Sequence, residues 1–197
     1  MTLSTTGEQS WTNRQASPKD GMVSAALEKD SAAPLNRDDR AGKYLVFELG
    51  SEEFGVRVLQ VREIMGVQDI TSLPQTPAHV KGVINLRGKV IPVVDLRLNF
   101  GLPEQEHTER TCIIVVQVNR RNRPISMGIV VDAVVEVITL AASDIEDTPD
   151  FGGGAATPYL LGMAKVKGKV KILLEIDQVL IGQDMSGLDA LIQEVEG

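Results

Sequence analysis

A repeated pattern constrains the fold of this chain more than any other feature of its sequence. The segment Phe54–Ile64 is similar to Met127–Val137, 73 residues later, and a Gly, two Val and a Glu coincide. A second match joins Arg87–Val90 to Lys167–Val170 at an offset of 80 residues. Two short matches can also arise by chance between Val-rich strands. A true repeat predicts two similar lobes that are individually too small to bury enough apolar surface, and that should therefore share a core with a groove between them.

The spacing of the apolar residues predicts a mainly β protein. Leu45, Phe47 and Leu49 alternate with other residues, as in a half-buried strand. Val58, Val61 and Met65 lie three or four apart, which favours a single helical turn. Turn residues separate the further apolar runs at short intervals, a pattern typical of small barrels rather than of a parallel sheet. These runs are Val80–Leu86, Lys89–Asp95, Thr111–Val118, Ile125–Val131, Ala133–Ile138 and Lys169–Ile176.

The two ends of the chain differ from this central part. Residues 1–41 contain few large apolar side chains and many Ser, Thr, Ala and charged residues, so we expect a disordered tail. Residues 42–182 form the predicted folded domain. Residues 183–197 are expected to form a short amphipathic helix, because apolar residues recur there at helical spacing. Those residues are Leu188, Leu191, Ile192 and Val195.

Composition excludes several classes of protein. A net charge of −7 and a pI near 4.9 argue against a nucleic-acid partner, which requires a clustered basic surface. No apolar run approaches the roughly 20 residues of a membrane span, so we expect no direct insertion into a membrane. Cys112 is the single cysteine, which precludes an internal disulfide and suits the reducing cytoplasm.

No set of residues with the spacing of a catalytic or metal site is recognisable. Cys112 has no evident partner base and reads as a small buried residue, and His79 and His107 have no ligand partners nearby. Asp95 and Asp132 each end a Val-rich run, where a carboxylate commonly caps a turn or helix. We therefore predict no enzymatic activity, cofactor or metal. The alternative, an enzyme or ligand-binding barrel, would need convergent polar groups in the groove between the lobes.

The run Val83–Leu96 predicts an exposed hairpin. Gly88 supplies the positive φ that a tight hairpin turn needs. Arg87 would stand at the turn, where its guanidinium can pair with a carboxylate of a partner. An ordinary solvated arginine is the alternative interpretation.

This hairpin, with several other blocks, resembles the family of CheW-like domains. The similarity lies in Asn85–Gly88 followed by Ile91–Arg97, and it extends in the same order over about residues 43–181. The further matching blocks are Tyr44–Leu49, Phe54–Val56, Val61–Ile64, Gly128–Val134, Tyr159–Gly162, Leu173–Leu174 and Ile176–Asp177. A basic segment, Asn119–Pro124, is longer than the family pattern leads us to expect.

The resemblance implies two intertwined SH3-like β-barrel lobes with a shared core. It implies a non-catalytic cytoplasmic adaptor, recruited to receptor arrays, that couples the tips of methyl-accepting chemotaxis receptors to the regulatory domain of the histidine kinase CheA. A CheW-like scaffold of a non-chemotactic pathway, such as surface motility, is the alternative. Kinase contacts would use both lobes, at residues that the resemblance does not assign. By matching position, receptor contact would involve Val61, Glu63, Ile64, Gly82, Arg87 and Gly88.

Overall fold

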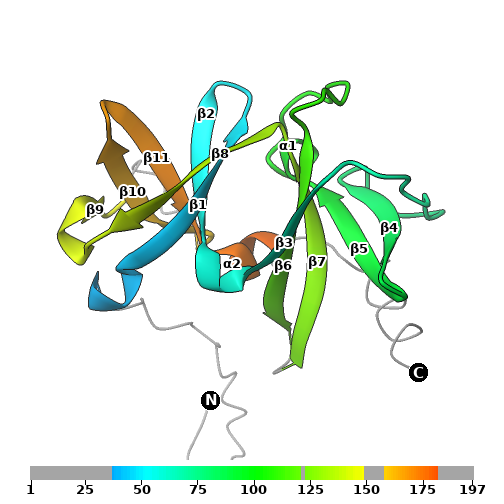
Figure 1. Cartoon of the computed structure of the whole chain (residues 1–197), viewed down its shortest axis with the longest axis horizontal. Helices are drawn as coiled ribbons and strands as arrows, with labels where there is room; N and C mark the ends of the chain where they lie inside the picture. The colour runs from blue at the N-terminus through cyan, green and yellow to red at the C-terminus, as the bar shows by residue number, and fades with distance from the viewer. Residues whose placement is uncertain (1–36, 121–122, 149–157, 182–197) are drawn as a thin grey trace, which may run out of the picture. The chain divides into compact units, whose positions relative to one another are not determined.

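The computed structural model describes residues 37–120, 123–148 and 158–181, and these fold into two β-sheets (Figure 1). The sheet of lobe A contains, in spatial order, β8 (Ala133–Leu140), β1 (Gly42–Leu49), β2 (Glu52–Arg57), β11 (Lys169–Leu174), β10 (Leu160–Val166) and β9 (Ile145–Glu146). The sheet of lobe B contains β3 (Val61–Gly66), β6 (Cys112–Arg120), β7 (Arg123–Val131), β5 (Lys89–Asp95) and β4 (Val80–Leu86). The helices are α1 (Leu96–Asn99) and α2 (Ile176–Ile181), with 3-10 turns η1 (Arg37–Arg40), η2 (Val58–Gln60) and η3 (Ala142–Asp144).

The strand order confirms the internal repeat. Strands β1 to β5 form the first copy, and β6, β7, β8, β10 and β11 form the second. Exchanging corresponding strands converts the order β8-β1-β2-β11-β10 of lobe A into the order β3-β6-β7-β5-β4 of lobe B. Each lobe therefore contains strands from both copies, and the two barrels are intertwined.

The agreement extends to individual residues. In lobe B the parallel pair β5–β7 places Val93 opposite Gly128, and in lobe A the parallel pair β11–β2 places Leu173 opposite Gly55. The β4–β5 pair shifts register between Val80 and Gly82, and the β10–β11 pair shifts between Leu160 and Gly162. These positions differ by the same 73 and 80 residues as the sequence matches.

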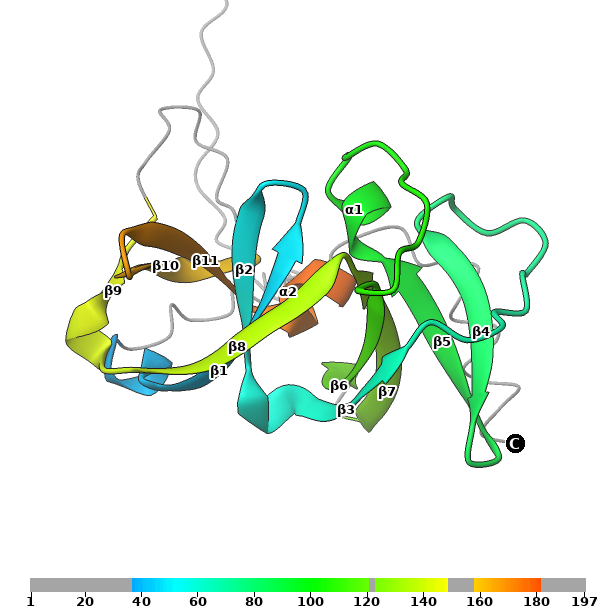
Figure 2. The ribbon, with the colours of Figure 1, turned by 45° about the horizontal axis from the view of Figure 1, so that its top comes forward.

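The core has three parts, because each sheet buries both of its faces. The interior of lobe A includes Tyr44, Val46 and Leu173, and the interior of lobe B includes Ile113, Val115 and Val130. A larger shared core lies between the sheets, and α2 contributes Ile176, Val179 and Leu180 to it. Figures 1 and 2 both show α2 between the two sheets. The predicted shared core is confirmed.

The predicted helical turn over Val58–Met65 is mostly wrong. Only Val58–Gln60 is helical, as η2, and β3 begins at Val61. A bulge between Val61 and Glu63 explains the misleading spacing. Val61 lies opposite Val116 and Ile64 lies opposite Ile114, so residues three apart share one face of the sheet.

The chain ends are described only in part. Arg37–Arg40, which the sequence placed in the predicted tail, forms η1. Arg40 is buried, donates to the Leu161 carbonyl oxygen at 3.0 Å and pairs with Asp147 at 2.6 Å. The rest of the predicted tail and the predicted C-terminal helix at 183–197 lie outside the described residues. Among the helices that the structure describes, none has the length and apolar character to cross a bilayer.

Candidate interaction site

The β4–β5 turn presents Arg87 to Glu63 of β3. Arg87 and Gly88 have φ values of 53° and 83°, the pattern of a type I′ turn, so the positive φ predicted at Gly88 is confirmed. The Asn85 side chain accepts a hydrogen bond from the Gly88 N–H at 2.8 Å. Arg87 Nη2 lies 2.9 Å from Glu63 Oε1, with side-chain exposed fractions of 79% and 29%. The turn geometry thus holds an exposed guanidinium beside a half-buried carboxylate.

This ion pair joins the two edges of lobe B. Strands β3 and β4 end the sheet on opposite sides, and the pair bridges them. In lobe A, the β10–β11 turn brings Lys167 to within 2.8 Å of Glu136 on β8. Glu136 and Lys167 are the repeat equivalents of Glu63 and Arg87. A corresponding ion pair is therefore present in both lobes, and by itself it has a structural explanation.

Val61 and Ile64 lie on the other face of β3. Val58 and Val61 pack against the shared core, and Ile64 is 45% exposed. Leu59, which the sequence analysis did not single out, is 86% exposed. We call Val58, Leu59, Val61 and Ile64 the η2–β3 strip. Glu63 lies opposite Val115 of the lobe B interior, so the predicted site residues fall on two faces of β3.

Gly82 has a packing role. It is buried, and a methyl group added there would lie 2.0 Å from the Thr71 carbonyl oxygen. Thr71 and Val83 exchange backbone hydrogen bonds of 2.9 Å across this point. Gly82 therefore lets the chain around Thr71 cross β4, and its contact with a receptor stays a prediction.

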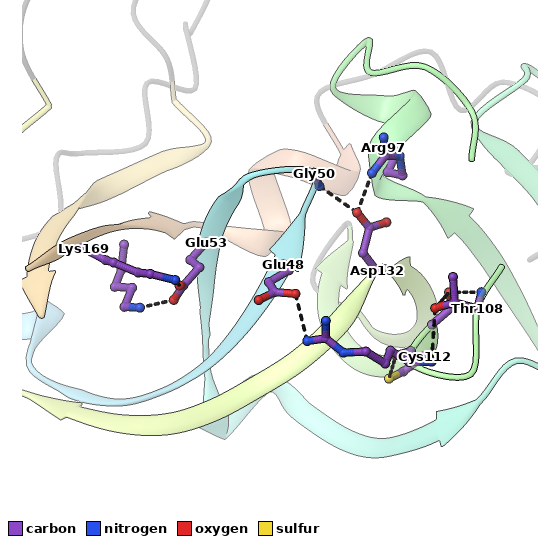
Figure 3. A network of polar contacts seen from close by, with 11 residues as sticks. Glu48, Gly50, Glu53, Arg97, Thr108, Cys112, Asp132 and Lys169 are labelled. Carbon is purple, nitrogen blue, oxygen red and sulfur yellow. Dashed lines mark hydrogen bonds and ion pairs between the residues drawn. The ribbon is translucent and has the colours of Figure 1, made fainter. Parts of the chain in front are cut away.

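A seam of polar contacts connects the lobes (Figure 3). Asp132 accepts from the Gly50 N–H at 2.7 Å and from Arg97 at 2.5 Å, and Glu48 pairs with Arg110 at 3.0 Å. The Cys112 thiol donates to the Arg110 carbonyl oxygen at 3.0 Å. These contacts connect β1 and the β1–β2 turn of lobe A to α1 and to the loop that precedes β6.

The other carboxylates of interest also have structural partners. Asp95 caps α1 by accepting from the N–H groups of Arg97 and Leu98, as its position predicted. Glu53 of β2 is buried and pairs with Lys169 and Lys171 of β11. Hydrogen bonds from these two lysines lower the pKa of Glu53. Within the described residues, no group of three or more His, Cys, Asp or Glu could hold a metal ion.

Known proteins match this chain over most of its length. The CheW-like domain family matches residues 43–183. The chemotaxis protein CheW of Klebsiella aerogenes is 37% identical over 147 residues, which are 75% of this chain and 86% of that protein. The chemotaxis protein CheW of Rhizobium meliloti is 38% identical over 140 residues, which are 71% and 88% of the two chains.

A solved structure supports the same relationship. The scaffolding protein TtCheW from Thermoanaerobacter tengcongensis is 33% identical and superposes with a TM-score of 0.64. The similarity covers 74% of this chain and 97% of that one. With the two-lobed strand order and the family match, these findings show that the chain belongs to the CheW-like domain family.

Proposed function

We propose that this protein is a non-catalytic adaptor that couples methyl-accepting chemotaxis receptors to the histidine kinase CheA. The observation that carries the proposal is the family match over residues 43–183, together with relatives of 37% and 38% identity named chemotaxis protein CheW. The partners would place the adaptor in the cytoplasm, at receptor arrays.

The η2–β3 strip is the proposed contact for the receptor tip. Leu59 and Ile64 are exposed beside Val58 and Val61, which reach the shared core. Such an apolar strip suits the apolar face of a helix. Glu63 and Arg87, on the neighbouring edge, would act as a charged rim that selects the partner more than it strengthens binding. Gly88 would shape the turn that carries Arg87.

The structural contacts of three buried or half-buried carboxylates support a scaffold rather than an enzyme. Asp95 and Asp132 are occupied by N–H groups and Arg97, and Glu53 by two lysines. A catalytic base needs a lone pair that can reach a substrate, and these carboxylates are engaged in holding the fold.

Coupling in such an adaptor would be thermodynamic. The receptor can influence the kinase only if its signalling states bind the adaptor and kinase with different free energies. A compact body with an intertwined backbone can hold both partners in a defined geometry without a large rearrangement of its own.

Calorimetric titration of the purified protein with the regulatory fragment of the kinase CheA tests this proposal. Saturable binding at micromolar concentration or tighter, about −8 kcal/mol at 1 μM, is the expected result. A parallel titration with a receptor cytoplasmic fragment tests the second partner. If the folded protein bound neither fragment from its own organism, the chemotactic role would be wrong, and a scaffold of another pathway would replace it.

A further inference from the structure

A cavity of about 630 Å³ opens where the end of α1 meets β2, β10, β11 and α2. Its lining includes Phe54, Phe100, Tyr159, Ile172 and Val179, and no lining side chain is an acid, lysine or arginine. The cavity is distinct from the η2–β3 strip and from the Glu63–Arg87 pair, because it shares no residue with either.

The cavity is an open edge of the shared core. Four aromatic rings form a row that runs outward from that core: Phe47, Phe54, Phe100 and Tyr159. The centroids of neighbouring rings in the row are 6.0, 5.6 and 6.0 Å apart. Phe47 is fully buried, whereas the other three are only partly buried. Partly exposed aromatic rings gathered at one place indicate a surface that another element covers.

The repeat shows that this edge is less covered in lobe A than in lobe B. Phe54 and Ile172 are half-buried in lobe A. Their equivalents in lobe B are Met127, 1% exposed, and Pro92, which is also buried. The same backbone framework thus leaves apolar side chains accessible in one lobe and closes over them in the other.

The start of the C-terminal segment lies close to the cavity. Helix α2 is the repeat equivalent of α1, and the segment that follows it is the C-terminal one, residues 182–197. That segment starts three residues after Val179, which lines the cavity.

The sequence of the C-terminal segment suits this place. Gly182 and Gly187 bracket a short stretch in which the chain can reverse direction. Beyond it, apolar residues recur at the i, i+3, i+4 and i+7 spacing of one helical face. A helix of about ten residues is marginal in water by itself, so an apolar stripe of this kind needs a surface to pack on. The residues of the stripe are Leu188, Leu191, Ile192 and Val195.

We propose that residues 182–197 fold back over this cavity and pack the stripe against Phe54, Phe100 and Tyr159. The C-terminal segment then covers the edge of the shared core that is open at lobe A. The inference does not depend on the adaptor role, because it concerns contacts within the chain.

Methyl NMR of the full chain labelled with ¹³C-methyl methionine tests this packing. Met163 lines the cavity, and Met127 lies in the shared core as a reporter of the fold. Leu191→Glu places a charge in the stripe, and Ala190→Glu places the same charge on the opposite side of the helix. We expect the Met163 resonance to shift in Leu191→Glu and in a chain that ends at Gly182, and to stay in place in Ala190→Glu. Met127 should be unchanged in all of them.

Three results would overturn the proposal. The first is a Met163 resonance that is the same in the full chain, in Leu191→Glu and in the truncated chain. The second is a shift of Met65 on β3 without a shift of Met163, which would place the segment against β3. The third is a Met163 shift that depends on protein concentration in the unmodified chain, which would show that a second copy covers the cavity.

Discussion

In lobe B the β4–β5 turn holds Arg87 beside Glu63, and in lobe A the β10–β11 turn holds Lys167 beside Glu136. The separations are 2.9 and 2.8 Å, and the two cations are exposed to 79% and 74%. The geometry is therefore the same, and the chemistry differs, because a guanidinium offers a planar fork and an ammonium a point charge. Because both lobes have an ion pair at this place, the pair alone does not indicate a binding site. A role in recognition must come from the planar guanidinium of Arg87 or from the apolar residues beside it.

The buried parts of the lobes differ more. Lobe A pairs Glu53 with Lys171, both buried, at the junction of β2 and β11. At the repeat-equivalent positions lobe B has Ser126 and Ile91. The same backbone arrangement thus accepts either a buried ion pair or uncharged side chains. A substitution in one lobe can therefore be compared with the equivalent substitution in the other.

The largest effect is expected at the two glycines where a segment crosses a strand. Gly82→Ala places a methyl group 2.0 Å from a backbone oxygen, so the free energy of unfolding should fall by about 3 kcal/mol. Gly162→Ala meets the Ile145 side chain at 2.7 Å and the Glu146 carbonyl oxygen at 2.8 Å, and the loss should be smaller because the backbone contact is less close than at Gly82 and the Ile145 side chain can move. Gly66→Ala, with nothing within 4 Å, is the control. Urea unfolding measures all three, and a mild effect at Gly82 would contradict the packing role.

Glu53→Gln should also destabilise the protein by about 3 kcal/mol, because it leaves the Lys171 ammonium buried without a carboxylate. The double variant Glu53→Ser with Lys171→Ile transfers the residues of lobe B and should recover most of that stability.

The lysines lower the pKa of Glu53, so its stabilisation is present above the ordinary value of 4.5 and is lost as the pH falls through the lower value of the folded state. Unfolding at pH 7 and pH 3 should show a difference between wild type and Glu53→Gln that shrinks in acid.

Ile64→Glu should weaken binding of a receptor cytoplasmic fragment at least tenfold, because an exposed apolar anchor of the η2–β3 strip becomes charged. Val137→Glu alters the repeat-equivalent residue of lobe A, which is 54% exposed. If lobe B alone receives the receptor, Val137→Glu should change the affinity less than twofold. Equal losses in calorimetry would show that the receptor contacts both lobes.

The smallest effect is expected from reversing the rim charges. Arg87→Glu should lower receptor affinity about fivefold, mainly through a slower association that depends on salt. Lys167→Glu is the matched change in lobe A and should leave binding unaltered. Both should change the free energy of unfolding by less than about 1 kcal/mol, because the two cations are exposed. Stopped-flow measurement of the association rate at two salt concentrations would show whether Arg87 and Lys167 differ in their effect on receptor binding.

The sequence was sufficient to predict the repeat, the two β lobes and the shared core. It sufficed because the Gly-containing turns and the alternation of apolar residues are local signals. The exchange of strands is not local. It depends on β3 pairing with β6 and on β8 pairing with β1, and only the family resemblance pointed to intertwined barrels.

The candidate site was harder to predict than the fold. A single bulge in β3 places Val61 and Ile64 on one face and Glu63 on the other, and nothing in the run Val61–Ile64 announces it. Gly82 matched the family pattern, yet its buried contact with Thr71 depends on a crossing segment that the sequence does not reveal. The equivalence of Glu136–Lys167 to Glu63–Arg87 could have been read from the repeat, which already aligned all four residues.

The sharing of strands between the lobes also governs how the molecule folds and unfolds. A cut in the loop between α1 and β6 would leave two fragments, neither with all the strands of a barrel. Lys171 meets Glu53, 118 residues earlier, so the lobe that contains the first strand cannot close until almost the whole domain has been made. Contacts so distant in sequence favour slow folding and a single all-or-none transition. The two lobes should therefore melt together in a calorimeter, and a change that unfolds either lobe should unfold the other with it.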